Sequence, residues 1–197
     1  MINEILTNLA YLFYPQDICA WEEKEKYLQS EEYKNLKRWI EIFDSDKGEL
    51  LRHNFKMEFD KDLILKNFED FSKLDWQDRC FKFNLTLIED GELQSINLYL
   101  SILLPYYIIR SRKHKTELFF SESKIKEIEN NNLSTRKIKD LIINIKEIVE
   151  TKLLYKEFPE ELICHVIKDI SFQDSRLGFF TMFNAFFNNE IIYEINN

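Results

Sequence analysis

Apolar side chains in the first 75 residues recur every three or four positions, which is the spacing of one face of an α-helix. A first short helix is expected to end before Pro15, with the apolar positions Ile2, Ile5, Leu6, Leu9, Leu12 and Phe13. Ser30 can cap a second helix, whose apolar stripe is Tyr33, Leu36, Ile40 and Phe43 and which the polar segment 44–48 ends. Asp60 predicts the start of a third helix, with Ile64, Phe68 and Phe71 facing inward.

The period changes to two at Cys80, as in a strand with one buried face. Its inward positions are Phe81, Phe83, Leu85 and Leu87, and alternation resumes at Ile96, Leu98, Leu100 and Ile102. Asp90-Gly91 between these runs fits a type I′ turn, so the two runs predict a β-hairpin. Pro105 lacks an N–H donor and indicates a bulge or edge position, after which residues 106–110 continue extended. Residues 117–120 predict a further strand in an antiparallel sheet of three or four strands.

The last third of the chain returns to helical spacing. Ser134 is expected to cap a helix whose inner face is Ile138, Leu141, Ile142, Ile145, Ile148 and Val149. Residues 162–170 fit either a helix or a strand, because their apolar run is short. After Gly178, a buried terminal helix is predicted from Phe179, Phe180, Phe183, Phe186 and Phe187. The fold class is therefore α+β and helix-dominated, with a small antiparallel hairpin-based sheet between N-terminal and C-terminal helices, in one domain over residues 1–197.

Composition and charge narrow the classes of partner. Hydrophobic residues make up 45% of the chain and aromatic residues 15%, enough for a sizeable core. The formal charge of −8 opposes contact with nucleic acid and anionic lipid and would attract a cationic protein. Cys19, Cys80 and Cys164 are expected to be buried reduced thiols, as in the cytoplasm. Glu4 stands where a secretory signal would carry a base, and the apolar run 102–109 is too short to span a membrane.

Side chains that support catalysis or metal binding are scarce. Cys164 and His165 are sequence neighbours, but adjacent side chains diverge on helices and strands, so they are not a ready-made dyad. The spacing of the cysteines and histidines matches no zinc motif, segment 44–48 departs from a calcium loop, and the three glycines are isolated from one another. The basic cluster 110–115 reads as a solvated strand end or as intramolecular ion pairs. We therefore expect no catalytic residue, metal or cofactor, and a protein that is not an enzyme.

Acidic clusters are the remaining feature, and most are expected to serve solubility. Their spacing does not indicate the two converging carboxylates that a hydrolase would need. An acidic face could instead steer a basic partner, with aromatic anchors supplying affinity. The residues predicted to bind a partner on this electrostatic argument are Asp44, Asp46, Glu49, Glu89, Asp90 and Glu92.

The segments Val166-Ile167-Lys168-Asp169-Ile170-Ser171 and Gly178-Phe179-Phe180-Thr181-Met182-Phe183-Asn184-Ala185-Phe186-Phe187 cover about the last fifth of the chain. They resemble the tail of small bacterial immunity proteins encoded beside polymorphic or contact-delivered toxins. The resemblance implies a cytoplasmic protein without turnover that binds a cognate, possibly basic, toxin and covers its active site or blocks its activation. Two other hypotheses are a carboxylate-dependent enzyme and a regulatory or structural subunit of a larger assembly.

Overall fold

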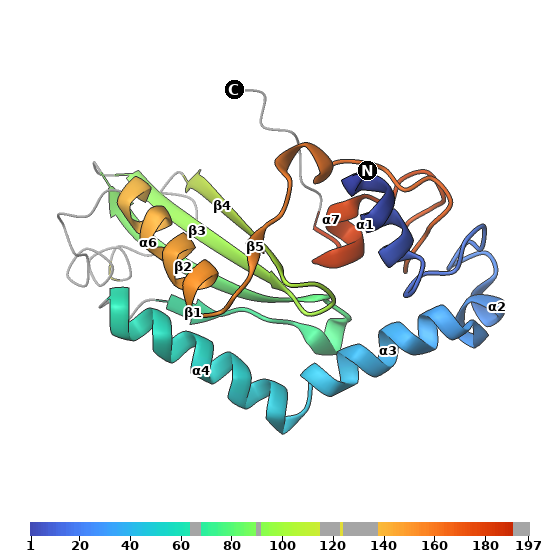
Figure 1. Cartoon of the computed structure of the whole chain (residues 1–197), viewed down its shortest axis with the longest axis horizontal. Helices are drawn as coiled ribbons and strands as arrows, with labels where there is room; N and C mark the ends of the chain where they lie inside the picture. Colours follow the sequence, from blue (N-terminus) through green and yellow to red (C-terminus); the bar gives the residue numbers. More distant parts are fainter. Residues whose placement is uncertain (64–67, 90–91, 115–122, 124–137, 191–197) are drawn as a thin grey trace.

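A computed structural model describes residues 1–63, 68–89, 92–114, 123 and 138–190 (Figure 1). The chain is α+β, as the sequence predicts. In order, its elements are α1 (Ile2–Ala10), α2 (Lys24–Gln29), α3 (Glu31–Phe43), α4 (Asp46–Leu63), β1 (Phe68–Asp70), the 3-10 turn η1 (Leu74–Trp76), β2 (Cys80–Glu89), β3 (Glu92–Ser101), β4 (Tyr106–His114), α6 (Ile138–Thr151), β5 (Lys156–Glu157), the 3-10 turn η3 (Glu160–Leu162) and α7 (Met182–Phe186).

Within the described residues, the sheet contains five strands in the order β1-β2-β3-β4-β5, whereas the sequence predicts three or four. The first four strands pair antiparallel, whereas β5 pairs parallel to β4 through two residues, so the sheet is mixed. The predicted hairpin is confirmed: Cys80 lies opposite Ser101 and Glu89 opposite Glu92. The turn predicted at residues 90–91 and the strand predicted at 117–120 lie outside the described residues.

One face of the sheet forms a phenylalanine-rich core, as the two-residue period predicts. Its buried side chains include Phe81, Phe83, Leu85, Ile96, Leu98 and Leu100. Helix α4 packs there through Phe59, whose ring lies 4.6 Å from that of Phe68 and 5.7 Å from that of Phe83. Helix α6 crosses the same face, and Tyr107 donates a 2.7 Å hydrogen bond to its Glu150 (Figure 1). The predicted inner face of α6 is confirmed, and its expected cap, Ser134, lies outside the described residues.

The start of α4 corrects the predicted third helix. Helix α3 is as expected, with the Ser30 hydroxyl accepting from the Tyr33 amide. Helix α4, however, begins at Asp46, so Asp60 lies inside it. Phe68 is in β1 and Phe71 is 45% exposed, while Ile64 lies outside the described residues. The reason is Gly48: a Cβ there would lie 1.8 Å from the Phe43 carbonyl oxygen, so its absence lets the two helices meet almost directly.

Helix α1 packs against α7 near the chain's other end, and this contact buries only part of its apolar surface (Figure 1). Leu6, Ala10 and Phe13 are buried, but Ile2, Ile5 and Leu12, which share the predicted apolar spacing, are exposed. The buried Tyr14 hydroxyl donates a 2.7 Å hydrogen bond to the Ala185 carbonyl and fixes the two segments together.

The C-terminal third is less regular than predicted. Residues 162–170 form neither a helix nor a strand beyond the end of η3; they are a loop with one bridge between Val166 and Thr181. Thr181 and Asn184 form a capping box, so the terminal helix begins only at Met182 and Phe179 is left 73% exposed. Buried side chains from both ends of the chain and from the sheet nevertheless belong to one core cluster.

The sequence also predicts three buried, reduced cysteines and no membrane-spanning segment. Cys19, Cys80 and Cys164 are free, but only Cys19 and Cys80 are buried, and Cys164 is half-buried. Among the described residues, no helix combines the length and the apolar character needed to cross a membrane.

Candidate functional site

The structure separates the acidic residues predicted to bind a partner. Asp44 caps the C-terminus of α3, and Asp46 and Glu49 lie in the first turn of α4, all three exposed. The ring of Phe43 contacts that of Phe81 at 5.8 Å, which places this corner near the start of β2. Glu89 lies eight residues beyond Phe81 along β2, which corresponds to about 26 Å of extended strand. The described part of the structure does not include Asp90 or the side chains of Glu89 and Glu92. The two groups therefore lie at opposite ends of β2 and do not form one compact cluster.

Asp44 also borders a groove that the sequence did not indicate. The groove consists of two adjoining hollows of about 410 and 170 Å³. The larger lies between α2 and residues 172–174, and the smaller between α3 and η1; Tyr33 and Gln77 line both. The other lining residues are Ala20, Trp21, Lys24, Tyr27, Leu28, Phe172, Gln173 and Asp174 in the larger hollow, and Leu36, Lys37, Ile40, Glu41, Asp44, Leu74 and Asp75 in the smaller.

The larger hollow has apolar walls that face solvent. Trp21 is 55% exposed and Leu28 is 43% exposed, whereas Tyr27 and Phe172 below them are buried. The Tyr27 hydroxyl donates to the Ser171 carbonyl at 2.9 Å, so this ring is anchored to the C-terminal loop. Exposed aromatic and aliphatic walls over an anchored aromatic floor are typical of a surface that another molecule covers.

The charges of the groove are uneven along its length. Glu41, Asp44 and Asp75 line the smaller hollow together with one base, Lys37, which lies 3.7 Å from Glu41. The larger hollow holds Lys24 and Asp174, and the Arg176 guanidinium lies 5.9 Å from the centre of the Trp21 ring. Among the described residues, Asp44, Asp75 and Asp174 form no ion pair. The end at Asp44 and Asp75 is therefore negative, and the end at Trp21 is apolar with two cations and one carboxylate.

Arg79 supports the groove from below and was missed by sequence reasoning. Its side chain is fully buried and donates to the Gln77 carbonyl at 2.6 Å and to the Asn184 carbonyl at 2.5 Å. The guanidinium also stacks over the Phe172 ring, 4.7 Å from its centre. Gln77 lines both hollows and Phe172 forms part of the floor of the larger one, so one buried cation positions both. A charged residue beside an alternating strand gives no signal of burial in the sequence.

Two groove residues have a backbone conformation that is unusual for side-chain-bearing residues. Gln77 has φ of +64° and Gln173 has φ of +51°. Left-handed backbone costs a non-glycine residue about 1–2 kcal/mol, so the surrounding contacts must hold it. The Arg79 bond to the Gln77 carbonyl is one such contact. The groove walls are therefore held in place rather than free to relax.

A second polar cluster lies where the C-terminal segment crosses the sheet. Burial raises the pKa of Asp78 to about 6, with Arg79 opposing and Glu190 adding to the rise. Burial also raises the pKa of Glu190, but hydrogen bonds from Lys82 and Tyr99 outweigh it, and the net shift is downward. Carboxylates with separated pKa values suit acid–base chemistry. Neither of these residues lines the groove. Glu190 attaches the segment to β2 and β3.

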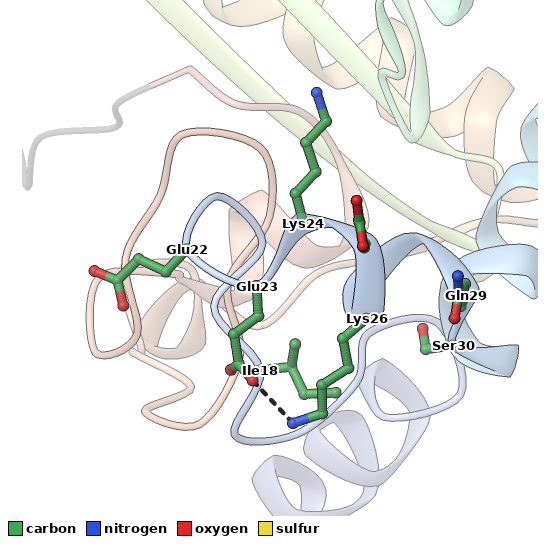
Figure 2. Close-up of a pocket in the computed structure, with 8 residues that line it drawn as sticks. Ile18, Glu22, Glu23, Lys24, Lys26, Gln29 and Ser30 are labelled. Carbon is green, nitrogen blue, oxygen red and sulfur yellow. Dashed lines mark hydrogen bonds and ion pairs between the residues drawn. The ribbon is translucent and has the colours of Figure 1, made fainter.

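A further hollow of about 780 Å³ adjoins the groove at Lys24 and is lined by Ile18 and by residues of α2 and its flanks. Figure 2 shows Glu22 and Lys24 pointing away from each other, while Glu23 and Lys26 form a 3.0 Å ion pair. That pair lowers the pKa of Glu23. Three glutamates and two lysines line this hollow, so it carries a small negative charge and, beyond the pair of Glu23 and Lys26, shows no arrangement of charges suited to a particular ligand.

The basic cluster of the sequence is partly paired within the molecule. Arg110 donates to both carboxylate oxygens of Glu160, at 2.9 and 2.8 Å, which is the intramolecular ion pairing expected for this segment. Lys113 also has an interaction within the chain. In the described ranges, no group of three or more histidine, cysteine or carboxylate side chains could hold a metal ion.

Comparison with known proteins gives no relative: neither a protein-family model, nor a characterised protein, nor a solved structure matches the chain.

Proposed function

We propose that the chain is an immunity protein that binds a cognate bacterial toxin in the cytoplasm and inhibits it without turnover. The observation that supports this proposal is the groove, which combines solvent-facing apolar walls with unpaired carboxylates. Buried aromatic anchors provide most of the affinity at protein interfaces, and charge complementarity speeds encounter. The net charge of −8 favours a basic partner over nucleic acid.

A pull-down tests this proposal. The tagged chain would be mixed with the products of its neighbouring genes, and any complex would be titrated by calorimetry. The proposal predicts a one-to-one complex and protection of cells that express the bound partner. A stable complex with a partner that is not toxic would instead favour the regulatory or structural subunit.

A carboxylate-dependent enzyme is the second candidate, and the observation that favours it is the pair of Asp78 and Glu190 with separated pKa values. Its weakness is that Lys82 and Tyr99 already occupy both oxygens of Glu190. Mass spectrometry of small molecules released from the purified protein tests this candidate. A retained ligand whose binding depends on Asp78 would favour the enzyme over the immunity protein.

A further inference from the structure

We infer that the groove receives a cationic amphipathic segment of the partner, with its apolar side chains between Trp21 and Leu28 and its lysine or arginine side chains at Asp44 and Asp75. This inference rests on the proposed function and adds to it the chemistry and the direction of the bound segment.

The position of the segment's apolar side chains follows from the exposure of the groove walls and the volume of the larger hollow. Trp21 and Leu28 are about half exposed, and the hollow between them has about 410 Å³, within the usual size of sites that receive side chains or small ligands. Its floor is aromatic and fixed by the hydrogen bond of Tyr27 to Ser171. Arg176 lies over Trp21 and Lys24 lines the same hollow, so a cation would gain little here, whereas an apolar side chain would cover both walls.

The position of the segment's basic side chains follows from the unpaired carboxylates of the groove. Asp44 and Asp75 line the smaller hollow from opposite sides, one on α3 and the other on η1, and neither has an ion-pair partner among the described residues. A lysine or arginine side chain between them would be attracted by both, while a phosphate or an acidic lipid would be repelled. The two ends thus set the direction in which a segment lies.

The support beneath the groove explains why it stays open before the partner binds. Arg79 fixes Gln77, which lines both hollows, and stacks on Phe172 in the floor. A preformed site loses less conformational entropy on binding, which raises affinity without new contacts.

Matched variants of exposed residues test the inference. Leu28→Arg changes the apolar wall, and its control Leu50→Arg makes the same change at a leucine that is 60% exposed outside the groove. Asp44→Asn with Asp75→Asn removes two negative charges from the end of the groove that would hold the basic side chains. Its control is Asp140→Asn with Glu147→Gln, which removes equal charge from exposed positions of α6, outside the groove.

The probe is a synthetic peptide with leucine and tryptophan every three or four residues and lysine elsewhere, titrated by calorimetry against the full chain. We expect Leu28→Arg to weaken binding at least tenfold. The Asp44 and Asp75 double variant should weaken it several-fold and reduce its salt dependence, and both controls should stay within twofold of the wild type. Equal binding by groove and control variants, or equal binding of a peptide with glutamate in place of lysine, would overturn the inference.

The same four variants, expressed with the partner found by pull-down, separate the two proposals. If the wild type binds no toxin and protects no cell, the proposed function fails, whatever the peptide does. If the wild type protects and Leu28→Arg protects equally well, the immunity function stands and the groove inference fails. Loss of protection in Leu28→Arg with protection kept in Leu50→Arg supports both proposals.

Discussion

The sheet with α4 and α6 and the groove beside α2 and α3 are built in different ways. In the sheet, the alternation of apolar and polar residues buries Phe81, Phe83 and their neighbours, and many similar apolar contacts each contribute to stability. In the groove, single contacts such as Arg79 to Gln77 and Tyr27 to Ser171 hold irregular backbone, and apolar walls stay exposed. The first region is buried within the chain, whereas the second leaves apolar side chains exposed to solvent.

The largest effect is expected in the sheet. Phe83→Ala removes a fully buried ring that contacts Phe59 and Phe68, and should lower the free energy of unfolding by about 3–5 kcal/mol. Phe179→Ala, at a 73% exposed ring, is the control and should change it by less than about 0.5 kcal/mol. Chemical denaturation measures both. Similar losses in the two variants would remove the distinction between buried and exposed aromatic positions.

Arg79→Met should have the next largest effect and lower the free energy of unfolding by about 2–3 kcal/mol, because it removes the donor from the carbonyls of the half-buried Gln77 and Asn184. Arg79→Lys should recover little of this loss, since one ammonium cannot reproduce the fork of the guanidinium. Denaturation gives the stability, and amide exchange near Gln77 reports whether the groove wall loosens. If Arg79→Met is as stable as the wild type, Arg79 does not support the groove.

Gly48→Ala tests the corner that joins the two regions. The added Cβ would lie 1.8 Å from the Phe43 carbonyl oxygen, so α3 and α4 must separate. We expect the free energy of unfolding to fall by about 1–3 kcal/mol, although alanine has a better helix propensity than glycine. Lys47→Ala, an exposed neighbour in the same turn, is the control. A gain in stability for Gly48→Ala would show that the two helices do not approach this closely.

The smallest effect concerns Asp78 and depends on pH. Because burial raises its pKa from 3.8 to about 6, the folded chain holds more protons than the unfolded chain between these values. The carboxyl therefore makes the fold less stable as the pH rises from about 4 to about 6. Asp78→Asn should be about 1–2 kcal/mol more stable than the wild type at pH 7, after allowance for its remaining contact with solvent, and nearly equal to it at pH 4. A pH-independent difference would contradict the raised pKa.

The regular elements could be predicted from the sequence because their signal repeats. Alternation from Cys80 to Ile102 predicts the hairpin and its inner face, and helical spacing predicts α3 and the inner face of α6. Where one close contact decides the structure, the prediction fails. Gly48 let α4 begin earlier, and the capping box at Thr181 shortened the terminal helix.

The candidate site could be predicted only in part. Negative charge on the segment around Asp44 was recognised, and Asp44 does border the groove. The groove itself joins residues from α2, α3, η1 and the C-terminal loop, which are up to about 150 positions apart in the chain, so no local pattern reports it. Arg79 was missed because a buried arginine beneath a groove looks, in the sequence, like any exposed one.

Hydrogen–deuterium exchange of the chain, alone and with the partner found by pull-down, tests the central claim most directly. The account predicts that binding slows amide exchange in residues 20–44, 74–77 and 172–174, while the exposed surface of α6 is unchanged. Slower exchange elsewhere, with these segments unaffected, would show that the partner binds another surface and that the groove is not the site.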